Sequence, residues 1–166
     1  MGKFVGWREA PARPYKPRDP EVTAKTMSAV KSRDSRAEMT LRRALWRRGL
    51  RYRLHARDLP GKPDIVFRSA KIAIFVDGDF WHGKGLLEDG ERAFRSALRT
   101  ARQDWWVEKI AANVARDKLT TERLKEKGWL VVRVWESDVT SDVGRFASKM
   151  ERAVAARTSG KRMPTS

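Results

Sequence analysis

The feature that most constrains this chain is an apolar run, Ile72-Ala73-Ile74-Phe75-Val76, that stops abruptly at Asp77-Gly78-Asp79-Phe80-Trp81-His82. Five consecutive apolar residues favour a central strand with both faces covered. The carboxylates, glycine, aromatic residues and histidine that follow make a poor core and a good site. We therefore expect a functional site at the end of a buried strand.

The rest of the chain supplies helices that can cover such a strand. Ser35, followed three residues later by Glu38, fits a capping box at the start of a first helix that Gly49 ends. Apolar periodicity and turn residues then predict, in chain order, strands at 52–55, 65–67 and 72–76, a short helix near 92–102, a long helix at 104–127, a strand at 129–135 and a closing helix at 143–156. This order predicts an α/β sandwich with a mixed central sheet flanked by helices.

The balance of charge points to a polyanionic partner. Lysine and arginine number 37 against 21 acidic residues, a formal net charge of +16. Such a charge attracts a phosphate backbone, but it equally suits a ribosomal protein, an architectural DNA binder or an anionic membrane face. The absence of cysteine excludes disulfides, thiolate nucleophiles and cysteine-type zinc sites. No apolar run approaches the roughly 20 residues of a membrane span and no signal peptide is evident, so we expect a cytoplasmic protein.

We expect one folded domain between two basic arms. With 166 residues the chain has room for one domain with one sizeable core. Residues 1–22 carry four prolines interleaved with arginine and lysine, which favours an extended basic arm. Residues 23–156 form the predicted domain, and the small, polar and basic residues 157–166 form a predicted flexible tail.

Residues at two strand ends could carry chemistry. Asp64 opens an apolar strand behind Pro63, so its carboxylate is placed to hold a hard cation; the alternative is an ordinary turn aspartate. His82 is one of only two histidines and could act as general base on a water molecule; the alternative is a structural imidazole. The neighbouring Phe80 and Trp81 could stack on or wedge between bases, or pack in the core.

One face of the predicted long helix carries polar residues that need partners. Trp106, Ile110, Asn113 and Asp117 fall at spacings of four, three and four, so they lie along one face. If this face is buried, Asn113 and Asp117 require hydrogen-bond partners, and a histidine at a nearby strand end would be a fitting one. The alternative places both residues at the solvated edge of the stripe.

Five fragments together resemble one family. In chain order they are MSAVKSRD at 27–34, LPGKPD at 59–64, FVDG at 75–78 with FWH at 80–82, WVEKI at 106–110 with NV at 113–114 and RD at 116–117, and GW at 128–129 with VWE at 134–136. In order and approximate spacing they are similar to the very short patch repair (Vsr) endonucleases, over roughly Thr23 to Val139. The resemblance implies a restriction-endonuclease-like fold, in agreement with the element order above.

The resemblance also implies a magnesium-dependent reaction. By this resemblance, Asp64 is the magnesium-binding carboxylate and the backbone carbonyl of Val76 is a further ligand. Glu38 and Asn113 hold water molecules of the ion. Mg²⁺ keeps several waters, so few protein ligands suffice, and one or two ions suit an in-line phosphodiester displacement.

The same resemblance implies a general base and a double-stranded DNA substrate. His82, oriented by Asp117, activates the attacking water, and the product is a nick in one strand. A mismatched step costs less to unstack, so side chains that enter the duplex can select it, and the family default is a T:G mismatch. The implied DNA contacts are Phe80 and Trp81 from the major groove, Met27 from the minor groove, and Lys62 and Arg33.

The sequence departs from the family at a structural zinc site. Typical members hold zinc with cysteine and histidine, whereas this chain has Asp79, Lys84 and Ser137 at those positions. We therefore expect no structural zinc and hypothesise that these three residues form a polar cluster in its place. The segment 83–103 also differs from the family's usual loop, which leaves the choice of substrate open.

Three functions remain open on the sequence. The first is a magnesium-dependent DNA endonuclease that nicks at or near T:G mismatches. The second is a sequence-specific or defence-type nickase or restriction nuclease, and the third is a catalytically silent, basic DNA-binding protein. We expect a monomer without a membrane partner, with a dimer as the alternative.

Overall fold

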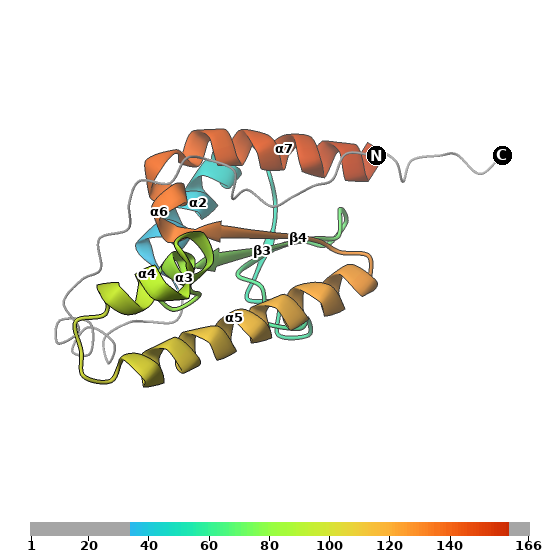
Figure 1. The fold of residues 1–166 in the computed structure, drawn as a ribbon. Helices are drawn as coiled ribbons and strands as arrows, with labels where there is room; N and C mark the ends of the chain where they lie inside the picture. Colours follow the sequence, from blue (N-terminus) through green and yellow to red (C-terminus); the bar gives the residue numbers. More distant parts are fainter. Residues whose placement is uncertain (1–33, 160–166) are drawn as a thin grey trace.

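A computed structural model describes residues 34–159, in which a mixed sheet lies between layers of helices (Figure 1). The strands, in the spatial order β1-β2-β3-β4, are β1 (Arg53–Leu54), β2 (Ile65–Phe67), β3 (Ile72–Asp77) and β4 (Leu130–Trp135). The pairs β1–β2 and β2–β3 are antiparallel, whereas β3 and β4 are parallel. The predicted α/β sandwich with a mixed sheet is therefore confirmed.

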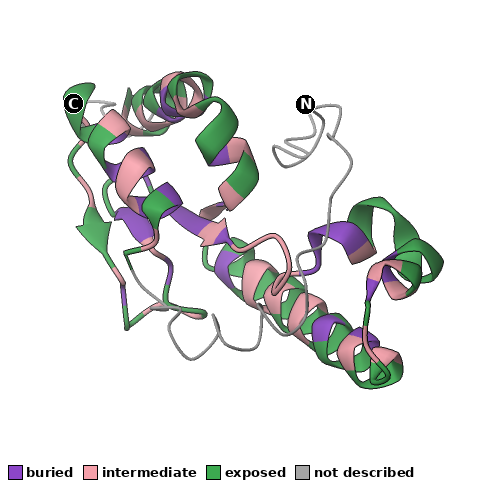
Figure 2. Cartoon of the chain, turned by 90° about the vertical axis from the view of Figure 1, so that its left-hand side faces the viewer, coloured by how far each residue is buried: buried purple, intermediate pink, exposed green. Residues whose placement is uncertain are grey.

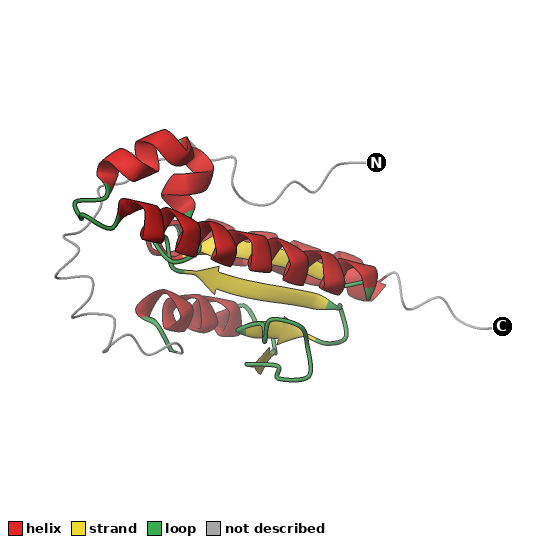
Figure 3. Cartoon of the chain, turned by 60° about the horizontal axis from the view of Figure 1, so that its bottom comes forward, coloured by secondary structure: helices red, strands yellow, loops and turns green. Residues whose placement is uncertain are grey.

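Helices cover both faces of the sheet. α2 (Arg36–Arg47) and α7 (Val143–Ser159) lie on one side, and α5 (Gln103–Glu126) runs along the opposite side (Figures 1 and 3). Buried residues concentrate on the inward surfaces of these layers (Figure 2). The larger core, which includes side chains of the sheet, α2 and α7, contains Leu41, Leu45, Ile72, Ile74, Phe146 and Met150.

β3 is buried on both faces, as its apolar sequence predicts. Ile72 and Ile74 belong to the larger core, while Ala73 and Phe75 pack with Leu124 of α5 in a separate cluster. Successive side chains of a strand point to opposite faces, which explains this division. Because β3 and β4 are parallel, their C-terminal ends meet at one edge of the sheet.

α2 begins as the capping pattern predicts, with one difference. The Ser35 side chain accepts a hydrogen bond from the backbone N–H of Glu38 at 3.2 Å. The Glu38 carboxylate accepts from the backbone N–H of Asp34 at 2.9 Å, one residue earlier than in a standard capping box. Its other oxygen is bound by Arg42. The start of this helix therefore also orients a buried carboxylate.

Three short helices differ from the sequence prediction. The segment between β3 and α5 forms α3 (Lys84–Glu88) and α4 (Gly90–Ala97), where one helix near 92–102 was expected. Gly90 has a φ of +82°, a conformation that favours glycine and lets the chain turn between the two helices. α6 (Glu136–Ser141) follows β4 directly and was not predicted. These short helices lie near the C-terminal ends of β3 and β4 (Figure 1).

α7 continues to Ser159, beyond its predicted end at 156. Arg157, expected at the start of a flexible tail, donates from Nε to the carbonyl of Ala70 at 2.6 Å and from Nη2 to that of Gly128 at 2.8 Å. These bonds tie α7 to the segments that precede β3 and β4. The predicted arm at 1–22 and the tail beyond Ser159 lie outside the described residues. Within residues 34–159, no helix is both long enough and apolar enough to cross a membrane.

Candidate active site

The turn that follows β3 folds back against α5. The backbone N–H of His82 donates to the carbonyl of Gly78 at 3.1 Å. Gly83 has a φ of +75°, and a Cβ at this position would lie 2.7 Å from Cγ2 of Val114 on α5. Only glycine permits so close an approach in this conformation. The turn therefore holds His82 directly beside α5.

α5 presents two polar side chains to this turn. Asp117 Oδ2 lies 2.6 Å from His82 Nδ1. Asn113 donates from Nδ2 to the carbonyl of Trp81 at 3.0 Å and so fixes the backbone immediately before the histidine. The expected meeting of this helical face with a histidine at a strand end is thus observed.

Two residues to which the sequence assigned no role complete this group. Arg133 donates from Nε and Nη2 to the two carboxylate oxygens of Asp77 at 2.6 and 2.7 Å, and Nη2 also lies 2.9 Å from Asp117 Oδ1. Asp77 is only 2% exposed. We call Asp77, His82, Asp117 and Arg133 the Arg133 cluster. A lone arginine in an otherwise apolar strand was the available signal, because it requires a buried counter-charge.

The charges of this cluster make His82 more basic. Burial alone lowers the pKa of His82, but the hydrogen bond with Asp117 and the charges of Asp77 and Asp117 outweigh burial and the opposing charge of Arg133. The pKa is therefore raised above its ordinary value of 6.5. For Asp117, burial raises the pKa, but the hydrogen bond with His82 and the charge of Arg133 lower it to below its usual range.

The contact with Asp117 indicates which nitrogen of the imidazole carries the proton. An ionised Asp117 can only accept a hydrogen bond, so Nδ1 of His82 carries the proton and Nε2 of the neutral ring keeps its lone pair. Within the described part of the chain, no hydrogen bond reaches Nε2. The ring is therefore arranged to accept a proton at that atom.

Asp64 lies immediately before β2, beside the C-terminal half of β3. The backbone N–H of Val76 donates to Asp64 Oδ2 at 2.8 Å, and the backbone N–H of Asp64 donates to the carbonyl of Ile74 at 3.0 Å. Burial, together with the charges of Glu38 and Asp77, raises the pKa of Asp64 to about 6, although the Val76 hydrogen bond opposes it. The surrounding protein thus stabilises the negative charge of this carboxylate only in part, as expected of a group that holds a cation.

A second group of the same residue types lies at the start of α2. Arg42 Nη1 lies 2.5 Å from Asp34 Oδ1, and its Nη2 forms an ion pair with Glu38 Oε1 and lies 2.9 Å from His55 Nε2. We call Asp34, Glu38, Arg42 and His55 the Arg42 cluster. The backbone N–H of His55 donates to the carbonyl of Asp64 at 3.0 Å, so this cluster is adjacent to Asp64.

Each cluster contains three groups that are close enough together to hold a metal ion: Asp34, Glu38 and His55 in one, and Asp77, His82 and Asp117 in the other. In both, a guanidinium already bridges the two carboxylates and supplies the positive charge. Asp64 differs, because it takes part in no ion pair within residues 34–159. Its carboxylate is therefore better suited to a hard cation than the carboxylates of the two clusters.

Phe80 and Trp81 pack against each other and against Trp106. The Phe80 ring centroid lies 5.2 Å from that of Trp81 and 5.3 Å from that of Trp106. These residues border a small core that includes Phe94 and Ile110. Both side chains contact this core but remain partly exposed. Packing in the core therefore accounts for part of their surface, and their entry into DNA stays a prediction.

Asp79, Lys84 and Ser137 come together as hypothesised. The Lys84 ammonium donates to Ser137 Oγ at 2.7 Å and lies 3.2 Å from Asp138 Oδ1. The backbone N–H of Ser137 donates to Asp79 Oδ1 at 3.4 Å, and that of Lys84 donates to the Asp79 carbonyl at 2.8 Å. A cross-link made of protein groups thus joins the start of α3 to α6.

The other predicted DNA contacts are placed only in part. Lys62 is exposed in the turn before β2, with a φ of +51° and its backbone N–H bonded to the Leu59 carbonyl at 3.0 Å. Its ammonium group is therefore accessible to a ligand. Met27 and Arg33 lie outside the described residues.

The sequence is similar to known DNA endonucleases. Residues 17–87 match the family model described as DNA mismatch endonuclease Vsr. The type II nicking enzyme V.NmeDIP of Neisseria meningitidis serogroup C is 42% identical over 135 residues, which cover 81% of this chain and 87% of that enzyme. The type II nicking enzyme V.HpaIIP of Haemophilus parainfluenzae is 37% identical over 139 residues, covering 83% and 94%. The DNA mismatch endonuclease Vsr of Escherichia coli (strain K12) is 36% identical over 118 residues, covering 71% of each chain.

Proposed function

The chain belongs to the Vsr family of DNA endonucleases, and from this premise we propose a magnesium-dependent enzyme that hydrolyses one phosphodiester in one strand of duplex DNA, at or near T:G mismatches. The observation that carries the proposal is the 2.6 Å contact between His82 Nδ1 and Asp117 Oδ2. The half-buried Asp64 lies at the same end of β3, where its carboxylate accepts from the backbone N–H of Val76, the neighbour of Asp77. A base and a cation-binding carboxylate at one site are the groups that such a hydrolysis needs.

Asp64 and the backbone carbonyl of Val76 would hold the ion. Both offer oxygen atoms, which Mg²⁺ prefers, and the raised pKa of Asp64 marks a negative charge that a cation would stabilise. Glu38 and Asn113, whose side chains are oriented by other hydrogen bonds, would bind water molecules of the ion. When one or two ions are bound, they neutralise charge on the phosphate.

His82 would act as the general base through Nε2. Nε2 takes a proton from a water molecule, the water oxygen forms a bond to phosphorus, and one P–O bond of the DNA backbone breaks. The departing oxygen is protonated by solvent. Asp117 keeps the proton of the neutral ring on Nδ1 and, being ionised, stabilises the imidazolium that forms.

Phe80, Trp81 and Lys62 would contact the duplex, together with Met27 and Arg33. Aromatic rings supported on one side by their neighbours can stack on a base or enter a base step, and entry costs least at a mismatch. The net charge of +16 supports strong, salt-sensitive binding to the phosphate backbone.

A second candidate is a nickase that selects a sequence rather than a mismatch. Two of the three relatives described above are named type II nicking enzymes, whereas the Escherichia coli relative is named a DNA mismatch endonuclease. The segment that differs from the family's usual loop forms α3 and α4 beside the candidate site. A different surface at this place could select a different substrate.

A strand-specific assay separates the two candidates. Labelled duplexes with a T:G mismatch or a T:A pair in the same context are incubated with the protein and either Mg²⁺ or EDTA. We expect magnesium-dependent cutting of one strand, faster on the T:G duplex; equal cutting of both duplexes at one defined sequence would favour the second candidate. Wild-type protein that leaves every duplex intact would contradict both.

Two aspartate variants complete the assay. Asp64→Ala should abolish nicking while DNA affinity in a gel-shift assay is retained. Asp58→Ala is the matched control, because Asp58 is exposed and pairs with Arg68 rather than with a residue of the candidate site. It should nick like the wild-type protein.

A further inference from the structure

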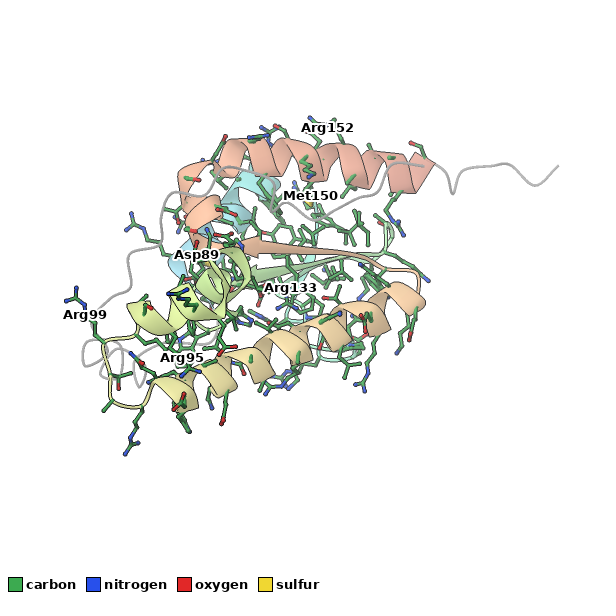
Figure 4. All side chains as sticks on the ribbon, in the orientation of Figure 1. Asp89, Arg95, Arg99, Arg133, Met150 and Arg152 are labelled. Atoms are coloured by element: carbon green, nitrogen blue, oxygen red, sulfur yellow. The ribbon has the colours of Figure 1, made fainter. Side chains whose placement is uncertain are left out.

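β4 carries a single charged residue in an apolar setting. Its sequence is Leu130-Val131-Val132-Arg133-Val134-Trp135, and the Arg133 side chain is 11% exposed. Arg133 pairs in register with Phe75 of β3, and its guanidinium carbon lies 4.6 Å from the centroid of that ring. The side chain therefore lies between the sheet and α5 (Figure 4). A guanidinium at this depth requires compensating carboxylates.

Arg133 connects two carboxylates that belong to different elements. It binds both oxygens of Asp77 on β3 and Oδ1 of Asp117 on α5, while Asp117 Oδ2 contacts His82 Nδ1. Because both of its oxygens are held, the Asp117 carboxylate cannot rotate away from the imidazole without breaking an ion pair. Arg133 Nη2 and His82 Nδ1, 3.5 Å apart, are both donors and form no hydrogen bond with each other. Arg133 thus orients the histidine through Asp117, and its charge also acts on the ring directly.

We propose that Arg133 is a positioning residue for the nicking reaction: anchored by Asp77, it holds Asp117 in the orientation that keeps His82 ready to accept a proton at Nε2. The inference rests on the proposed function, in which His82 is the general base. A purely structural role leads to a different expectation. An ion pair that only stabilises the fold can be replaced by a neutral pair without changing the reaction.

Arg133→Gln is the principal variant. On a duplex that the wild-type protein nicks, we expect kcat to fall about 10- to 100-fold with little change in KM, as for other residues that orient a functional group. Arg133→Lys keeps the charge but cannot bind two carboxylates in the same fixed geometry, so it should recover part of kcat. Arg157→Gln is the matched control, since Arg157 contacts the chain near the opposite end of β3 and β4, and it should leave kcat unchanged.

The pH dependence gives a readout that a structural role does not move. The charged groups that act on His82 are Asp77 on β3, Asp117 on α5 and Arg133 on β4. Loss of the positive charge in Arg133→Gln should raise the pKa of His82 and move the acidic limb of kcat/KM to higher pH. Loss of the negative charge in Asp77→Asn should move that limb to lower pH. Unchanged limbs in both variants would count against the proposal.

A double variant keeps the test open if Arg133→Gln alone leaves Asp77 unpaired and fails to fold. Asp77→Asn combined with Arg133→Gln replaces the ion pair by two amides, and circular dichroism reports whether it folds. Slow nicking by the folded double variant supports the proposal, and wild-type kcat in either folded variant overturns it. Wild-type nicking by His82→Ala would instead contradict the proposed function, whereas inactive His82→Ala beside fully active Arg133→Gln would contradict only the role of Arg133.

Discussion

The Arg133 cluster and the Arg42 cluster contain the same kinds of residue, one arginine, two carboxylates and one histidine, but they are connected differently. In the Arg42 cluster the arginine lies 2.9 Å from the histidine itself, at Nε2 of His55. In the Arg133 cluster the arginine holds Asp117, and Asp117 accepts the hydrogen bond from His82. A guanidinium can only donate hydrogen bonds, so Nε2 of His55 accepts from Arg42 and has no lone pair left to accept a proton.

Under the proposed function, the connections within a cluster rather than its composition distinguish the base His82 from His55. His55 is one partner of a buried arginine, whereas His82 is held at Nδ1 by a carboxylate and has no hydrogen bond to Nε2 within residues 34–159. Both clusters influence Asp64, since Glu38, Arg42 and Asp77 all act on its pKa. The Arg42 cluster therefore adjusts the charge around the proposed metal-binding carboxylate of Asp64, and the Arg133 cluster orients the proposed base, His82.

Replacing each histidine by alanine should give the largest difference in nicking rate between the two clusters. His82→Ala removes the proposed base, so we expect the single-turnover nicking rate to fall by about 10²- to 10⁴-fold. His55→Ala should lower the rate far less, because the His55 ring is held by Arg42 and is not the proposed base. Equal losses in the two variants would remove the distinction between the clusters.

Arg42→Met should chiefly affect stability. It removes the partner of Glu38, which is 3% exposed, and we expect a loss of about 3–5 kcal/mol in the free energy of unfolding, measured with urea. Adding Glu38→Met should recover much of this loss because no buried charge is then left unpaired. A single variant as stable as the wild-type protein would show that Glu38 does not depend on Arg42.

Lys84→Met extends the comparison to a buried cation whose partners are Ser137 and Asp138. We expect a loss of about 1–3 kcal/mol in the free energy of unfolding, because Lys84 is 8% exposed and its partners lose a donor. The pH dependence of nicking should not change. Metal analysis of the purified wild-type protein is the companion measurement, and one equivalent of zinc would contradict the role of this cross-link.

Asp117→Asn tests the electrostatics of the Arg133 cluster. His82 must be deprotonated to act as a base, so nicking by the wild-type protein should rise with pH, with a midpoint above 6.5 because its pKa is raised. The variant removes a negative charge that raises this pKa, so the midpoint of kcat/KM should move to lower pH while the maximal rate falls. An unmoved midpoint would indicate that another group is the base.

The sequence predicted the parts of the site that depend on local pattern. The apolar run and its abrupt polar end located β3 and His82, and the spacing along α5 placed Asn113 and Asp117 on one face. The short helices α3 and α6 were missed because five and six residues are too few to establish a helical period.

The Arg133 cluster shows what local pattern cannot supply. Arg133 and Asp77 are 56 positions apart in the sequence, and they meet only because β4 pairs in parallel with β3. Arg42 and Glu38, by contrast, are four positions apart on one helix, a spacing at which side chains meet. Long-range strand pairing therefore determined which carboxylate became the anchor of Arg133.

The most direct test is the protonation state of His82, measured by NMR on protein with ¹⁵N-labelled histidine. The chain has 2 histidines, so His55→Ala leaves a single ring to follow. Long-range ¹H–¹⁵N correlations should show the proton of the neutral ring on Nδ1 and an unprotonated Nε2, with a pKa above 6.5. A neutral ring protonated at Nε2, or a pKa below 6.5, would contradict the assignment of His82 as a base poised by Asp117.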